Sequence, residues 1–141
     1  MTLELEILET SFDVLAPRGE ELVAIFYRRL FAAAREVEPM FAGADMLNQR
    51  TKLLATLVLL RKSLRDLKGI APRLRSLGAL HVAYGARPEH YPVVANVMLD
   101  SMAELAGDAW TPQVAAAWRH ALNFVAGVML DGAAEAERLA A

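Results

Sequence analysis

The sequence contains no cysteine among its 141 residues. Disulfides, thiolate metal sites, iron–sulfur clusters and cysteine nucleophiles are therefore all excluded. A chain without cysteine is compatible with the reducing cytoplasm, where we expect this protein to work. Histidine is also scarce, since only His81, His90 and His120 occur, and no pair of them has the spacing of a zinc site such as HxxxH.

Neither sign of charge dominates, because 15 Lys and Arg stand against 17 Asp and Glu. The net charge of −2 predicts no basic surface, so we expect neither nucleic acid nor a membrane as a partner. The longest apolar run, Leu53–Leu60, is far shorter than the ~20 residues that cross a bilayer. The acidic, amphipathic start of the chain predicts no signal peptide.

Strand signals are nearly absent, with no alternating run bounded by Asn-Gly or Asp-Gly. Apolar residues instead recur at helical spacing, as Leu8, Phe12 and Leu15 do. We therefore predict an all-α fold in which residues 1–141 form a single domain. The expected helices cover residues 3–16, 18–34, 45–67, 72–84, 88–105 and from 111 to about 131 or beyond, with a fraying end.

Capping residues and helix breakers predict the boundaries of these helices. Asp45 is expected to cap the long third helix, and Thr111, which precedes a proline, predicts the start of the last. Gly69 and Pro72 are expected to end the third helix and to open the fourth. Gly107 is expected to end the fifth.

His81 lies on the apolar stripe of its predicted helix, one and two turns after Leu77 and Leu74. A lone histidine among leucines is either a core residue with one satisfied hydrogen bond or a ligand to a metal or haem iron. One imidazole makes a poor zinc site. Haem needs only one protein ligand, because the porphyrin supplies four.

Haem also needs an apolar slot, an aromatic ring and polar groups opposite the histidine. Phe41 lies alone before the long helix, and Tyr27 lies at the edge of an apolar helix face. Gln49 heads a face that Leu53 and Leu57 continue at i+4 and i+8. Each also has a plainer interpretation, with Phe41 in the core, Gln49 solvated, and the Tyr27 hydroxyl in water.

The order of these residues resembles that of bacterial single-domain globins, especially those similar to the haem domain of flavohaemoglobins. Six stretches carry the resemblance: FYRRLF (26–31), EPMF (38–41), NQRTKLL (48–54), LGALHVAYG (77–85), PEHYPVV (88–94) and AAAWRHALNFVAGVM (115–129). The resemblance implies a globin fold of about six to seven helices around a haem b, iron protoporphyrin IX.

The resemblance also implies a role for each matched residue. His81 would be the proximal iron ligand, and Phe41 would be the aromatic wedge against the porphyrin. Tyr27 and Gln49 would form a polar pair on the opposite, distal side of the haem, with Leu53 as the apolar wall between them.

Tyr91 matches a proximal tyrosine that joins the histidine and a last-helix glutamate in a hydrogen-bonded triad in flavohaemoglobins. This chain departs from that pattern, because the glutamate position falls near Ala133, and Leu122 stands where relatives often have tyrosine.

Further haem contacts are expected along the slot and at the propionates. Along the slot these are Leu57, Tyr84, Val94, Val125 and Met129, and at the propionates they are Lys52 and Arg87, with Arg50 as a weaker candidate. Lys52 and Arg87 are equally well explained as ordinary surface charges.

We expect reversible binding of O₂, and of CO and NO, at a five-coordinate ferrous iron, for oxygen binding, storage or transport. Hydrogen bonds from Tyr27 and Gln49 would stabilise negative charge on the ligand. The enzymatic alternative is a nitric oxide dioxygenase that depends on an external reductase. A haem-based gas sensor and a haem-free interaction protein are further alternatives. No catalytic residue is assigned.

Overall fold

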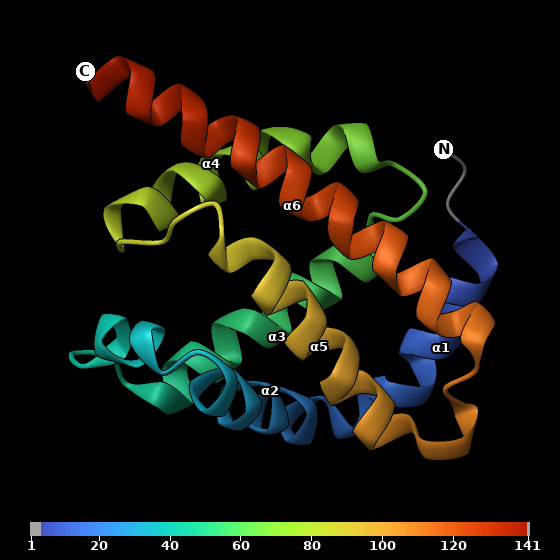
Figure 1. Cartoon of the computed structure of the whole chain (residues 1–141). Helices are drawn as coiled ribbons and strands as arrows, with labels where there is room; N and C mark the ends of the chain where they lie inside the picture. Colours follow the sequence, from blue (N-terminus) through green and yellow to red (C-terminus); the bar gives the residue numbers. More distant parts are fainter. Residues whose placement is uncertain (1–3, 141) are drawn as a thin grey trace.

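The computed structural model describes residues 4–140, which form six α-helices, three 3₁₀ helices and no strand. In chain order these are α1 (Leu5–Leu15), η1 (Ala16–Arg18), α2 (Gly19–Ala33), η2 (Arg35–Phe41), α3 (Met46–Lys62), α4 (Leu67–Ala83), α5 (His90–Ala106), η3 (Gly107–Ala109) and α6 (Pro112–Ala140). The central helix α5 packs on both α2 and α6, α4 packs along α6, and α3 packs on α2 (Figure 1). The all-α prediction is confirmed.

Several predicted helix boundaries are confirmed by their hydrogen bonds. The Asp45 carboxylate accepts the backbone N–H of Leu47 at 3.0 Å at the start of α3. The Thr111 hydroxyl accepts the N–H of Val114 at 3.2 Å at the start of α6. Gly107 follows α5 with a φ of 57°, a conformation that favours glycine.

The predicted boundary between the third and fourth helices is wrong. Helix α3 ends before Ser63 and α4 begins after Asp66, so Gly69 and Pro72 lie inside α4. The Asp66 carboxylate lies over the first turn of α4, since one of its oxygens would be 2.6 Å from a Cβ at Gly69. A carboxylate at this end of a helix is favourable and compensates in part for the backbone hydrogen bond that Pro72 cannot make, and the packing of α4 along α6 supplies the rest.

The other helix ends lie within a few residues of the expected positions where the structure describes them. Helix α5 begins at His90, two residues later than predicted, and α6 extends to Ala140, which agrees with the expectation that it runs to about residue 131 or beyond. Residue 3 of the predicted first helix lies outside the described residues. Although α6 has 29 residues, no helix within residues 4–140 is long and apolar enough to cross a membrane.

Helices α4 and α6 approach each other so closely that two glycines are required. A Cβ at Gly78 would lie 1.9 Å from the carbonyl oxygen of Met129, and a Cβ at Gly132 would lie 2.0 Å from that of Arg75. Both glycines are buried. Because the neighbouring atoms belong to the backbone, no side-chain movement could make room for a methyl group.

The first prediction is that Gly132→Ala destabilises the fold by about 1–3 kcal/mol or more, because the added methyl forces α4 and α6 apart. Gly127→Ala in the same helix is the matched control, since Gly127 is exposed and a Cβ there meets nothing within 4 Å. The control should gain about 0.5–1 kcal/mol from helix propensity. Urea unfolding followed by circular dichroism measures both, and equal stabilities of the two variants would contradict the close contact.

Candidate functional site

His81 lies near the end of α4, where its imidazole is half-buried. Its Nδ1 is 2.8 Å from the backbone carbonyl oxygen of Leu77, one turn earlier. Because a carbonyl can only accept a hydrogen bond, we infer that Nδ1 carries the hydrogen and that Nε2 keeps its lone pair. This tautomer offers Nε2 as a ligand to a metal.

Two tyrosines lie beside His81. The ring centroids of Tyr84 and Tyr91 are 5.8 Å and 6.5 Å from that of His81. The Tyr91 hydroxyl is buried and has no hydrogen-bond partner within the described part of the chain, and burial raises its pKa above the usual value. Ala133 is buried and its methyl group offers no acceptor. Tyr91 therefore lies beside His81 without a hydrogen-bonded carboxylate among the described residues.

Tyr27 and Gln49 come together from α2 and α3. Tyr27 is buried, and Gln49 is half-buried. Burial raises the pKa of the Tyr27 hydroxyl, while a hydrogen bond with the Gln49 side chain lowers it in part. The two polar side chains of the expected distal pair thus share one contact.

Aromatic rings surround Tyr27. The Phe41 ring, at the end of η2, meets Tyr27 edge-on with centroids 5.7 Å apart. Phe26 and Phe31, both on α2, lie 5.1 Å and 6.0 Å from the Tyr27 ring. Phe31 was not among the expected site residues, although its position four residues after Tyr27 on the same helix could have indicated the contact.

Four of the apolar residues expected along the slot come from α3 and α6. Leu57 and Met129 are buried, while Leu53 and Val125 are partly buried and pack against the core. Within residues 4–140 no hydrogen bond joins the side chains of Tyr27 or Gln49 to His81, and no ring pair joins His81 to Tyr27 or Phe41.

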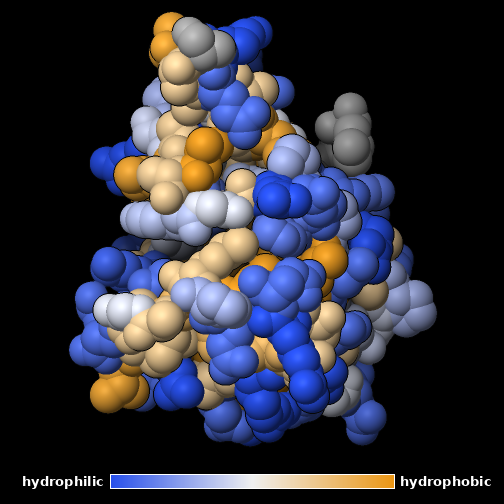
Figure 2. Space-filling view, turned by 60° about the vertical axis from the view of Figure 1, so that its left-hand side comes forward, coloured by the Kyte–Doolittle hydropathy of each residue, from blue (hydrophilic) through white to orange (hydrophobic). Residues whose placement is uncertain are grey.

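Large apolar side chains are uncovered near the end of α4 and the start of α5. Leu80 and Tyr84 are 51% and 59% exposed, and Val94 is 38% exposed. Met40 of η2 is also exposed, and its methyl group would lie 3.9 Å from a Cβ at Gly85, which directly follows Tyr84. Figure 2, which brings this side of the molecule forward, shows apolar surface among the polar groups. An apolar partner would be needed to remove this surface from water.

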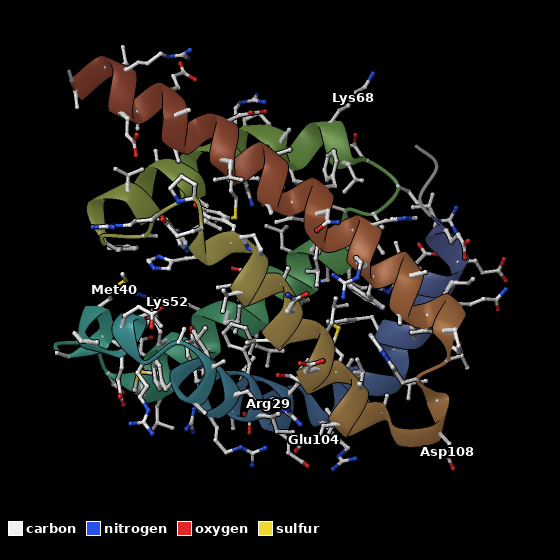
Figure 3. The ribbon with its side chains drawn as sticks, viewed as in Figure 1. Arg29, Met40, Lys52, Lys68, Glu104 and Asp108 are labelled. Carbon is white, nitrogen blue, oxygen red and sulfur yellow. The ribbon has the colours of Figure 1, made fainter. Side chains whose placement is uncertain are left out.

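The expected propionate contacts are at the surface. Lys52 and Arg87 are exposed and form no ion pair with the described residues. Lys52 lies at the same end of the molecule as Met40 (Figure 3). Arg50 is half-buried, and its Nε is buried without a hydrogen-bond partner.

Of the other histidines, His90 has a structural contact. Its Nδ1 accepts the Arg87 N–H at 3.0 Å, and this hydrogen bond fixes the start of α5.

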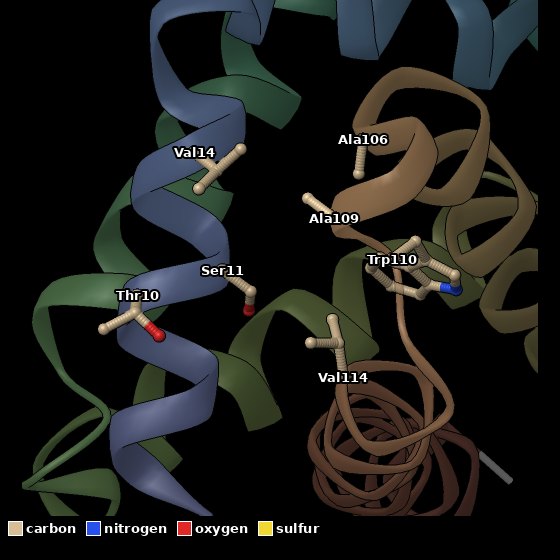
Figure 4. A pocket seen from close by; sticks show the side chains of 7 residues that line it. All are labelled: Thr10, Ser11, Val14, Ala106, Ala109, Trp110 and Val114. Carbon is tan, nitrogen blue, oxygen red and sulfur yellow. The ribbon is translucent and has the colours of Figure 1, made fainter.

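A cavity of about 190 Å³ lies elsewhere, between α1, the end of α5 and the start of α6 (Figure 4). Its lining residues are Thr10, Ser11, Val14, Ala106, Ala109, Trp110 and Val114. None of the expected site residues is among them. The Ser11 hydroxyl has a structural role there, because it accepts the Trp118 indole N–H at 2.9 Å and donates to the Ile7 carbonyl at 2.6 Å.

The second prediction is that Gln49→Leu raises the pKa of Tyr27 further above its usual value. The substitution removes the hydrogen bond that lowers this pKa and leaves the burial that raises it. A pH titration of the tyrosine ring carbons by nuclear magnetic resonance resolves the effect, because the sequence has only three tyrosines. The control is Asn48→Leu, at an exposed position on the same helix. An unchanged Tyr27 titration in Gln49→Leu would show that the contact is absent in solution.

Comparison with known proteins places this arrangement in a family. The flavohaemoprotein of Bacillus subtilis is 30% identical over 128 residues, and that of Vibrio cholerae is 29% identical over 132 residues. These alignments cover 89% and 90% of this chain but 32% and 33% of the relatives. The chain therefore spans about a third of the length of these relatives.

Solved structures share the fold. A bacterial globin from Campylobacter jejuni superposes with a TM-score of 0.82 at 24% identity, covering 93% of this chain and 94% of that one. An engineered carbene transferase from Rhodothermus marinus, described as a putative nitric oxide dioxygenase, superposes with a TM-score of 0.88 at 23% identity, and the superposition covers 98% of both chains. The Globin family model matches residues 24–129, which is more than half of the sequence. The chain belongs to the globin family.

Proposed function

We propose that this globin binds haem b through Nε2 of His81 and reversibly binds O₂, CO or NO, for oxygen binding, storage or transport. The observation that carries the proposal is the state of His81, whose Nδ1 is occupied by the Leu77 carbonyl so that Nε2 is free to act as a ligand. Bound haem would supply an iron centre that takes up a diatomic gas.

The residues around His81 fit a haem. A porphyrin is a large apolar plane, and the uncovered side chains of Leu80, Tyr84 and Val94 lie on the elements that flank His81. Covering such side chains is favourable by roughly 25 cal/mol for each Å² removed from water. Lys52 and Arg87 are cations without an ion pair among the described residues, which suits contacts with propionates.

The distal residues are suited to hold a polarised ligand. The Tyr27 hydroxyl and the Gln49 amide each have an N–H or O–H that can donate, and a ligand that gains negative charge on binding accepts such hydrogen bonds. Each donor would contribute on the order of 1–3 kcal/mol. Leu53 and Leu57, which are partly and fully buried, would keep water away from the ligand.

Nitric oxide dioxygenase activity with a separate reductase is the enzymatic alternative. It would use the same distal pair, and the Rhodothermus marinus protein with the same fold is described as a putative nitric oxide dioxygenase. The proximal side favours reversible binding, because Tyr91 has no partner within residues 4–140 and Ala133 provides no carboxylate.

The extent of the domain and its location are also part of the proposal. The matched residues 24–129 leave out α1 and the last part of α6, and α1 packs against α6. We therefore propose that residues 1–141 work as one globin domain. The lack of cysteine suits a cytoplasmic protein.

The third prediction is that His81→Ala abolishes stable haem binding, because no other side chain replaces the proximal ligand. Titration of the purified protein with hemin, followed by the Soret absorption, measures the affinity. Added imidazole should restore part of the absorption by entering the space that the substitution leaves. His120→Ala, at an exposed position on α6, is the matched control and should bind like the wild type. Wild-type affinity in His81→Ala would refute the assignment of the ligand.

The fourth prediction is that Tyr27→Phe accelerates O₂ dissociation by about tenfold or more if the lost hydrogen bond is worth ~1.4 kcal/mol. CO dissociation should change much less, because bound CO carries less negative charge. Stopped-flow displacement measures both rates in the ferrous haem protein. If both rates are unchanged in Tyr27→Phe, the hydroxyl does not act on the ligand.

A further inference from the structure

Tyr27, Phe31 and Phe41 form a closed triangle of aromatic rings in which each ring contacts the other two. The centroid distances are 6.0 Å between Tyr27 and Phe31, 5.7 Å between Tyr27 and Phe41, and 5.3 Å between Phe31 and Phe41. Phe26 adds an edge-on contact to Tyr27 at 5.1 Å. The Tyr27 ring is therefore bounded by other rings from both α2 and η2.

The geometry of these contacts restricts the orientation of Tyr27. Phe41 meets Tyr27 at 73° and Phe31 at 63°, which are edge-to-face arrangements that aromatic rings prefer. A rotation of the Tyr27 side chain would break its contacts with Phe31 and Phe41 together. Its hydroxyl is consequently held toward Gln49, the residue whose hydrogen bond lowers its pKa.

We propose that Phe31 is a positioning residue that sets the rate of ligand release through Tyr27. Phe31 is only partly buried, unlike Tyr27 and Phe26, so the core does not depend on it in the same way. It lies one turn after Tyr27 on α2 and supports both Tyr27 and Phe41. Loss of the Phe31 ring frees Tyr27 to move its hydroxyl away from the ligand. This inference rests on the proposed function of the distal pair.

The experiment compares Phe31→Leu, Tyr27→Phe and the double variant in the ferrous haem protein. Phe31→Leu should accelerate O₂ dissociation by about threefold to tenfold, which corresponds to a partial loss of one hydrogen bond. CO dissociation should change by less than about twofold, since CO depends little on the donor. In the Tyr27→Phe background the same substitution should have no further effect on O₂.

The carbon–oxygen stretching frequency of the CO complex gives a second readout that packing alone does not change. Hydrogen-bond donors near the ligand shift this frequency, so Phe31→Leu should move it toward the value in Tyr27→Phe. Phe12→Leu is the matched control, because Phe12 is buried against Trp118 with centroids 6.0 Å apart and makes none of the ring contacts of the triangle. The control should lose stability and keep both the frequency and the O₂ rate of the wild type.

The outcomes separate the inference from the function on which it rests. If Tyr27→Phe changes O₂ release and Phe31→Leu does not, the role of Phe31 is refuted and the distal pair stands. An effect of Phe31→Leu that persists in the Tyr27→Phe background also refutes positioning through Tyr27. If Tyr27→Phe itself has no effect, the distal part of the proposed function fails. Phe31→Met, which keeps a long apolar side chain without a ring, carries the same expectations if Phe31→Leu does not fold.

Discussion

The contact between α4 and α6 is the constraint on which the position of His81 depends. Gly78 and Gly132 each face a carbonyl oxygen of the other helix, at distances that leave no room for a methyl group. Since backbone meets backbone, neither helix can rotate or slide without the two separating. His81 follows Gly78 by three residues on the same face of α4, so this contact fixes the place of the imidazole.

The groups beside His81 and Tyr91 determine which polar contacts these two side chains make. Gly132 is buried, and a Cβ there would meet the Arg75 carbonyl of α4, while the next residue, Ala133, is buried and carries only a methyl group. The Tyr91 hydroxyl has no partner within the described residues, and the acceptor for His81 Nδ1 is the neutral carbonyl of Leu77. Under the proposed function, an imidazole that donates to a carbonyl would be a weaker electron donor to iron than one paired with a carboxylate.

The sequence predicted helix boundaries best where they depend on neighbouring residues. The caps at Asp45 and Thr111 depend on a few neighbouring residues, and both were found. The start of α4 was misplaced because the effects of Gly69 and Pro72 are outweighed by packing of α4 along α6. Phe31 and Gly78 stood in the matched stretches, but their roles depend on contacts with η2 and α6 that no local pattern shows.

Tyr27 and His81 are held in place by different kinds of contact, so substitutions near them are expected to have different effects. Tyr27 is held by side-chain rings, so exchanging one ring alters its freedom while the α2 backbone keeps its place. His81 is held by backbone contact, so a change at Gly78 affects the fold before it affects the ligand. The helix α5, which packs on both α2 and α6 and carries Tyr91, is the element that connects them. Under the proposed function, a substitution at the partly buried Phe31 would change ligand release at a smaller cost in stability than a substitution at Gly78 would.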